Sequence, residues 1–142
     1  MPCSTKYLGK TTQLSDSTGD IGEIKEITPP EISIDELETT TYGAGYWRTF
    51  CAGLKNGGTL GVTCFYGTDA SANAAQIRMN ARAIGDPSGN CEPYTITFPD
   101  SKTMTFSGII VGMPITAPID DNMLITYNIK VTGAITGTLF TK

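Results

Sequence analysis

From residue 60 onward, apolar and polar residues alternate along several short stretches of the chain. Alternation with a period of two places every second side chain on one face of a β-strand. Threonine fills many of the polar positions, and β-branched residues favour half-buried strands. The pattern therefore predicts a mainly β protein. The alternating apolar residues are Leu60, Val62, Cys64 and Tyr66; Tyr94, Ile96 and Phe98; Met104 and Phe106, continued by Ile109 to Val111; and Met123, Ile125, Tyr127, Ile129 and Val131.

An earlier segment departs from this alternation. Ile21, Ile24 and Ile27 recur at every third position. That spacing fits neither plain alternation nor a lasting helix, because Pro29-Pro30 follows. A β-bulge in a strand over residues 21–28 would reconcile the spacing with extended structure.

One segment has the pattern of an amphipathic helix. Within residues 70–84, Ala74, Ile77, Ala81 and Ile84 recur at helical spacing. An apolar stripe of this kind more often packs on a core than forms an interface, so we expect this face to be buried against the core. Together these elements predict a β-sandwich or partial barrel with one flanking α-helix.

A long segment from Pro29 to Gly67 separates two predicted strands. It starts as a strand, continues as a polar stretch spaced by glycines, and closes with aromatic residues, an Asn-Gly-Gly turn and a second strand. Loops of this length are usually functional or disordered, and aromatic residues argue against disorder. We therefore expect a long inter-strand loop that contacts another surface. For Tyr46 and Trp47, a binding hot spot and a simple loop anchor are equally open roles.

The first twenty residues are polar, and Tyr7 and Leu8 are their main apolar side chains. Such a segment buries little of its own surface. We expect an extended N-terminal arm over residues 1–20 that is ordered only when docked, with Tyr7 and Leu8 making the contacts. The length of 142 residues suits a single domain, which we place at residues 21–142.

Composition argues against several classes of chemistry. The chain has no histidine, which removes Ser–His and Cys–His nucleophile pairs and the commonest zinc ligand. Asp35 and Glu36 are adjacent, so on a strand they point to opposite faces. The run Asp120-Asp121-Asn122 lacks the spacing and the final glutamate of a calcium loop. We therefore expect no enzymatic activity, no metal and no cofactor.

Charge and cysteine spacing narrow the possibilities further. The net charge is −4 and no basic run exists, so the electrostatic footprint of a nucleic-acid reader is absent. The four cysteines, Cys3, Cys51, Cys64 and Cys91, contain no Cys-x-x-Cys spacing. Free thiols are therefore expected, rather than a zinc site or a redox motif.

The order of the segments is similar to that of a known family. The segment IDELETTTYGAGYWRTF leads into the turn GLKNGG and the strand TLGVTCFYG. A short helix, the strand pair YTITFPDSKTMTFSGIIVGM and the final strand NMLITYNIKVTGAIT follow. This order resembles the major tail proteins, or tail tube proteins, of long-tailed bacteriophages and prophages, over roughly Ile21 to Thr141.

The resemblance implies a β-sandwich flanked by a helix, with copies forming hexameric rings that stack into a tube for DNA passage into the host. The implied partners are other copies of the chain and tail proteins such as the tape measure, the tail tip and the terminator. Duplex DNA would pass through without specific binding, and no membrane anchor is implied. The implied location is the virion, with assembly in the bacterial host cytoplasm.

The resemblance also implies that the long loop and the N-terminal arm bridge neighbouring subunits and rings. The loop residues expected at these contacts are Glu38, Thr39, Thr40, Thr41, Tyr42, Gly43, Tyr46 and Trp47. Glu23, Lys25 and Glu26 lie on a predicted strand and are expected to include charges that line the channel. An acidic balance there would repel phosphate and let DNA slide.

Two other classes of function stay open. A carbohydrate-binding or adhesin-type β-sandwich would act as a monomer and use Tyr46 and Trp47 as a sugar-stacking platform. A histidine-free carboxylate hydrolase would need two acidic side chains that converge in a cleft. Rings or tubes favour the structural role, whereas a monomer that binds glycans favours the carbohydrate-binding role.

Overall fold

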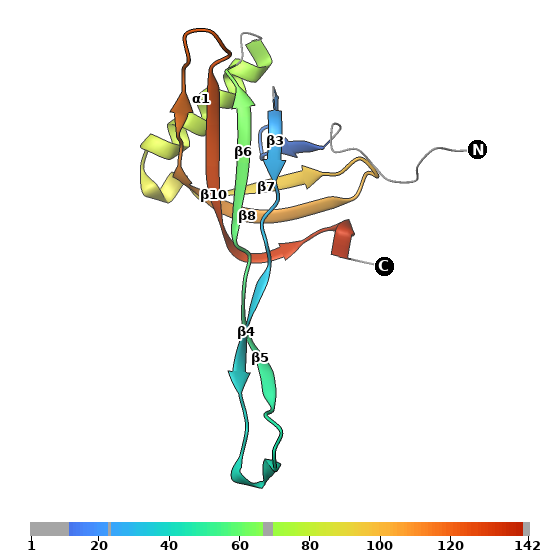
Figure 1. Cartoon of the computed structure of the whole chain (residues 1–142). Coiled ribbons are helices and arrows are strands. Elements are labelled where there is room, and N and C mark those ends of the chain that lie inside the picture. The colour runs from blue at the N-terminus through green and yellow to red at the C-terminus, as the bar shows by residue number, and fades with distance from the viewer. Residues whose placement is uncertain (1–11, 23, 67–69, 141–142) are drawn as a thin grey trace, which may run out of the picture.

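A computed structural model describes residues 12–22, 24–66 and 70–140 of the chain. Most of the strands join one antiparallel sheet in the order β2-β1-β7-β8-β10-β6-β3, with β9 paired to β10. Strands β7 and β8 cross β6 and β10 steeply, and α1 covers one side of the sheet (Figure 1). This arrangement confirms the predicted mainly β fold with one flanking helix. The strands of the sheet are β1 (Gln13–Ser15), β2 (Asp20–Ile21), β3 (Ile24–Thr28), β6 (Thr59–Phe65), β7 (Glu92–Thr97), β8 (Thr103–Gly112), β9 (Ile115–Thr116) and β10 (Leu124–Thr136).

The sheet curls until its two edge strands approach each other. β2 and β3 lie at opposite ends of the strand order, yet β2 ends at Ile21 and β3 begins at Ile24. Three peptide units span at most about 11 Å, so the two edges are close in space. The strand predicted over residues 21–28 is therefore two strands, which lie on opposite edges of a partial barrel.

β3 carries the predicted bulge. Its pairing with β6 shifts register between Ile24 and Glu26. Ile24 and Ile27 both pack against the core, while Lys25 and Glu26 between them are exposed. The extra residue of the bulge explains the three-residue spacing, because it leaves two consecutive residues on the outer side of the strand.

Side chains from both halves of the folded sheet meet in one core. The alternating apolar residues are largely buried, as the sequence predicts, although Tyr66 and Val111 at the ends of their stretches are 49% and 59% exposed. Full burial of a side chain of this kind contributes about 1.5–3 kcal/mol. The buried apolar residues are Leu14, Ile21, Leu60, Val62, Cys64, Ala75, Met79, Tyr94, Ile96, Met104, Phe106, Ile110, Ile125, Tyr127, Ile129 and Val131.

The thiols of Cys51, Cys64 and Cys91 are free, as the spacing predicts, and Cys3 lies outside the described residues. Cys64 is fully buried among apolar side chains. Burial raises the pKa of its thiol to about 11, because a buried thiolate loses its hydration. Cys64 therefore acts as a small apolar core residue.

The helix α1 (Ala70–Ile84) begins and ends where the sequence predicts, but the prediction of its buried face is wrong. Ile77 and Ile84 are 57% and 82% exposed, and Ala74 and Ala81 are exposed as well. The apolar stripe of the helix thus faces away from the core. Among the described residues, no helix is long and apolar enough to span a membrane.

The buried face of α1 carries Ala75, Gln76 and Met79 instead. The side-chain amide of Gln76 donates a hydrogen bond of 2.6 Å to the carbonyl of Phe65. The hydroxyl of Tyr94 donates to the sulfur of Met79 at 3.9 Å. Partners on β6 and β7 therefore decide which face of the helix is buried, and helical spacing alone does not reveal them.

The N-terminal arm is shorter than expected. Residues 13–20, which the sequence analysis places in the arm, form β1 and the start of β2. β1 pairs with both β2 and β7, and Leu14 is fully buried in the core. A single leucine in a polar segment has no periodicity, so only the pairing with β7 shows that it is a core residue. Tyr7 and Leu8 lie outside the described residues.

A buried carboxylate joins this N-terminal strand pair to the helix. The Oδ2 atom of Asp16 lies 2.8 Å from Nη2 of Arg82, and its Oδ1 atom lies 3.4 Å from Nη2 of Arg78. The backbone amides of Thr18 and Gly19 also donate to Oδ1, at 2.9 and 3.0 Å. Burial by itself raises the pKa of Asp16, but these donors outweigh it and hold the pKa below its usual value.

Replacing Asp16 should test this cluster. Asp16→Asn keeps an acceptor for the turn but loses the charge opposite Arg82, so the free energy of unfolding at pH 7 should fall by on the order of 2 kcal/mol. Because the folded-state pKa is lowered, the contribution of Asp16 is present above its unfolded pKa of about 3.9 and is lost as the pH falls through the folded pKa. Urea unfolding curves of wild type and variant should therefore converge on acidification.

The control for this measurement is Asp100→Asn. The Asp100 carboxylate is exposed and also accepts a backbone hydrogen bond within a turn, from the amide of Lys102 at 3.2 Å. This variant should change stability by less than about 0.5 kcal/mol. A stability gap between wild type and Asp16→Asn that stays constant with pH would show that the Asp16 charge contributes nothing.

A second pair of variants tests which face of α1 is buried. Met79→Ala removes a fully buried side chain and should lower the free energy of unfolding by about 2–5 kcal/mol. Ile84→Ala on the exposed stripe should change it by less than about 0.5 kcal/mol. Thermal and urea unfolding of dilute protein give both values. Equal losses of unfolding free energy in the two variants would show that the apolar stripe is buried, as the sequence predicts.

Candidate assembly surface

A long β-hairpin projects from the body of the molecule (Figure 1). Its strands β4 (Ser33–Glu38) and β5 (Phe50–Asn56) form a separate two-stranded sheet. The long loop predicted from the sequence is, for most of its length, paired β-structure instead. The reason is continuity of pairing: Thr28 lies opposite Gly61 in the body, and Ser33 lies opposite Asn56 in the hairpin. β3–β4 and β5–β6 thus make one extended antiparallel ribbon.

The glycines after Asn56 form the joint between the hairpin and the body, and they do not form the tight turn that the sequence predicts. Gly58 has φ of +77°, and a Cβ there would lie 2.5 Å from the carbonyl oxygen of Glu31. A Cβ on Gly57 would lie 2.5 Å from Val131. The carbonyl of Gly58 accepts a hydrogen bond of 3.0 Å from the amide of Val131. Glycine is required because two backbone segments meet here.

The hairpin exposes apolar side chains on both of its faces. Leu37 and Phe50 are about half exposed, and Leu54 is 81% exposed. A two-stranded sheet without a covering layer is marginally stable in water. These exposed apolar side chains make the hairpin the candidate assembly surface.

The distal end of the hairpin, residues 39–49, is held by threonines. The amide of Thr39 donates to the carbonyl of Thr49 at 2.8 Å. The amide of Thr49 donates to the hydroxyl of Thr40 at 2.9 Å. A short 3-10 helix (Tyr42–Ala44) follows, and it ends at Gly45 with φ of +74°. This bonding orders the tip while its larger side chains stay outside.

The sequence-predicted contact residues therefore gather at one place, at and beside the tip of the hairpin. Tyr42 and Tyr46 are fully exposed, and Trp47 is 82% exposed. Beside them, the Arg48 guanidinium lies 4.0 Å from the Glu38 carboxylate, and both side chains are largely exposed. The remaining predicted residues at this end are Glu38, Thr39, Thr40, Thr41 and Gly43.

The expected channel residues lie on the body. Glu23 is outside the described residues, while Lys25 and Glu26 are exposed on the edge strand β3. The Lys25 ammonium sits 5.9 Å from the centre of the Phe65 ring. Glu26 pairs with Thr63, whose hydroxyl lies 3.3 Å from that of Thr126. These residues share the outward face of β3, β6 and β10.

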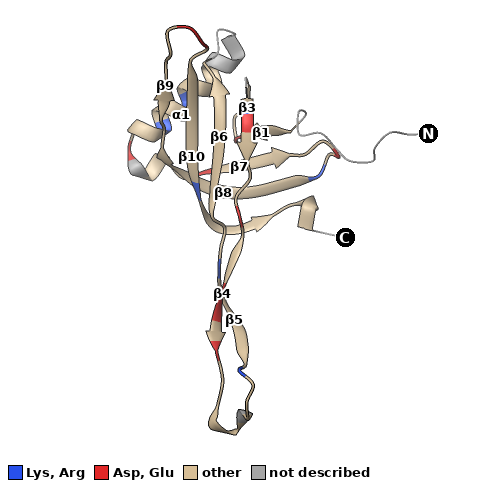
Figure 2. Cartoon of the chain, in the orientation of Figure 1, with Lys and Arg blue, Asp and Glu red and all other residues tan. Residues whose placement is uncertain are grey.

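Charge is unevenly placed along the molecule (Figure 2). Acidic side chains concentrate on β4, at Asp35, Glu36 and Glu38, and the hairpin also carries Arg48 and Lys55. Within the described residues, no group of three or more His, Cys, Asp or Glu side chains could hold a metal ion. The site thus offers apolar and charged contact surface.

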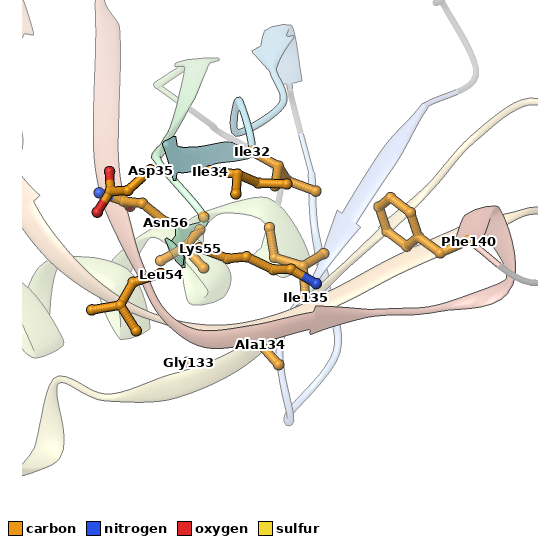
Figure 3. Close-up of a pocket in the computed structure, with 12 residues that line it drawn as sticks. Ile32, Ile34, Asp35, Leu54, Lys55, Asn56, Gly133, Ala134, Ile135 and Phe140 are labelled. Carbon is orange, nitrogen blue, oxygen red and sulfur yellow. The ribbon is translucent and has the colours of Figure 1, made fainter. Parts of the chain in front are cut away.

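A groove lies at the root of the hairpin, where it meets the C-terminal part of the chain (Figure 3). Its volume is about 800 Å³. Lys55 extends to the side where Ile135 and Phe140 lie, while Asp35 and Leu54 lie on the opposite side. Sequence reasoning did not identify this groove. Alternation at Ile32 and Ile34 indicates a strand, but the partners of that strand across the groove are about a hundred residues away.

Comparison with known proteins gives one family and several similar structures. Residues 6–138 match the family described as "Lambda phage tail tube protein, TTP". No curated protein matches the chain in sequence. The fold is similar to a chain in the virion of a native gene transfer agent particle, with a TM-score of 0.71 and 11% identity, covering 94% of this chain and 99% of that chain.

Two further solved structures share the fold. One is a chain in the tail of an empty gene transfer agent particle with C6 symmetry, with a TM-score of 0.69 and 12% identity over 92% of this chain and 98% of that chain. The other is from the sheath–tube complex of an extracellular contractile injection system, with a TM-score of 0.66 and 13% identity over 89% and 86%. With the family match over residues 6–138, these findings place the chain in the lambda phage tail tube protein family.

Proposed function

We propose that copies of this chain assemble into hexameric rings that stack into a tail tube, the conduit through which DNA passes into the host. The observation that carries the proposal is the uncovered hairpin in a chain of the tail tube family. Its exposed apolar faces need a covering surface, and a neighbouring copy supplies one. The C6 symmetry of the similar gene transfer agent tail supports the hexameric ring.

Edge strands give the ring its second type of contact. β2 and β3 are the two ends of the main sheet. A free strand edge is an aggregation liability unless something covers it. In a closed ring, a neighbouring copy would cover the edges that the curled sheet leaves open. The hairpin tip, with Glu38 to Gly43, Tyr46 and Trp47, would then bridge copies in neighbouring rings.

We place Lys25 and Glu26, together with Glu23, at the channel wall. The outward face of β3, β6 and β10 that carries the first two also carries Thr59, Thr63, Thr126 and Lys130. Glu23 and Glu26 balance the charges of Lys25 and Lys130, so this face attracts duplex DNA little. DNA would therefore pass without specific binding.

Other tail proteins complete the proposed assembly. The tape measure, the tail tip and the terminator would contact the inside and the two ends of the tube. The chain would act as a purely structural subunit of the virion, without catalysis, after assembly in the bacterial cytoplasm. Residues 1–12, including Tyr7 and Leu8, would add contacts between copies.

Negative-stain electron microscopy tests the assembly. Dilute protein should be monomeric, and concentrated or seeded protein should form rings and tubes, because association must compensate for the ordering of contact surfaces. A protein that stays monomeric at millimolar concentration after seeding would contradict the proposal. Binding of glycans by that monomer would favour the carbohydrate-binding alternative.

Replacing residues 40–48 with an Asn-Gly turn should abolish tubes and leave the fold intact. The two-residue turn can join Thr39 to Thr49 without changing the β4–β5 register. The removed side chains are exposed, so circular dichroism and thermal melting should change little. An unfolded variant would show that the tip belongs to the folding unit, and normal tubes would show that the tip is dispensable.

Assembled tubes should bind duplex DNA weakly even at low salt, where electrostatic attraction is greatest. A gel shift with assembled tubes gives the measurement. Lys25→Glu is the variant to compare, because it removes a positive charge from the proposed wall and should change DNA binding little. Micromolar, salt-sensitive binding by wild-type tubes would contradict a smooth conduit and indicate a DNA-gripping surface.

A further inference from the structure

We infer that the groove at the hairpin root is the socket for the hairpin tip of a second copy. The inference rests on the proposed tube and names the two surfaces that meet in it. The socket consists of Ile32, Ile34 and Lys55 on the hairpin with Val131, Ile135 and Phe140 on the body, and Asp35 at its far side. The tip consists of Tyr42, Tyr46, Trp47, Arg48 and Glu38.

The groove has the character of a binding site. Its walls are mostly aliphatic and aromatic, and its volume of about 800 Å³ is in the range that holds several large side chains. Ile32, Ile34 and Phe140 are each about half exposed. Apolar surface of this size in a hollow is stabilised when another apolar surface excludes water from it.

The charges in the groove complement those at the tip. Among the described residues, no carboxylate lies within ion-pair distance of Lys55. At the tip, Glu38 and Arg48 form a loose pair of 4.0 Å that is open to solvent. Docking can therefore pair Glu38 of one copy with Lys55 of another, and Arg48 with Asp35. The Lys55 ammonium also suits the faces of Tyr42, Tyr46 and Trp47.

The tip cannot reach the groove of its own chain. Lys55 of the groove pairs with Ile34, and Glu38 of the tip is four residues further along β4. At about 3.3 Å per residue this separation is roughly 13 Å. The copy whose groove receives the tip must therefore be shifted along the hairpin axis by at least this distance. Copies in stacked rings are shifted in this way. Because tip and socket are different surfaces, each copy can use its tip on one neighbour and its socket on another. The contact can therefore repeat from ring to ring.

Charge reversal with rescue tests the pairing. Lys55→Glu and Glu38→Lys should each raise the protein concentration needed for tube formation at least about tenfold, because like charges then face each other at every copy around the ring. The double variant should return to within about threefold of wild type. Since Glu38 and Lys55 are far apart within one chain, rescue reports contact between chains. Lys102→Glu, on an exposed loop of the body, is the matched control and should assemble normally.

Zero-length carbodiimide crosslinking gives a readout that does not depend on tubes. In a mixture of ¹⁴N- and ¹⁵N-labelled wild-type protein, mass spectrometry should find a Lys55–Glu38 crosslink between differently labelled chains. Tubes without this crosslink and without charge-reversal effects would overturn the socket and leave the proposed function standing. Crosslinks from Lys6 or Lys10 to Asp35 would also overturn it, by assigning the groove to the N-terminal segment. Absence of both tubes and crosslinks would overturn both proposals.

Discussion

The backbone pairing of one antiparallel ribbon, in which β3–β4 pairs with β5–β6, links the folded body of the molecule to its exposed hairpin. Its inner half lies in the main sheet, where Leu60, Val62 and Cys64 are buried. Its outer half has no covering layer and exposes apolar side chains on both faces. The change takes place at Gly57 and Gly58, where the ribbon packs directly against Val131 of β10 and its own two backbones meet at Gly58 and Glu31. Because a bare two-stranded sheet is only marginally stable, the outer half is the part of the chain that contacts with other copies would stabilise.

This division separates folding from assembly. The body has its own core, and the Asp16 carboxylate with Arg78 and Arg82 fastens the helix to the N-terminal strands. None of these contacts involves the hairpin, so a monomer can fold before it finds a partner. The apolar stripe of α1 that carries Ile77 and Ile84 is exposed like the hairpin, and the core is complete without it. The body thus has a complete core, while the hairpin keeps exposed apolar side chains available for contacts with other copies.

Much of the architecture could be predicted because alternation is a local signal. Ile125, Tyr127 and Ile129 alternate with polar residues and are buried in one long strand. That the segment from Glu38 to Trp47 is ordered could also be predicted, since it is rich in aromatic residues; its role as a contact surface stays a prediction. The family resemblance added the tail tube, which the match over residues 6–138 bears out.

The sequence by itself determined the alternating strands after residue 60, the extent of the helix, the β3 bulge and the free thiols of Cys51, Cys64 and Cys91, since each depends on neighbouring residues or on spacing. Only the tertiary structure decided three further features. Leu14 is a core residue because β1 pairs with a strand eighty residues away, from Leu14 to Ile96. The helix buries the face with Met79 instead of the face with Ile77, because the hydrogen-bond partners of the buried face lie on the strands β6 and β7. The hairpin projects because backbone segments distant in sequence meet at Gly58. These features depend on contacts between segments that local periodicity does not encode.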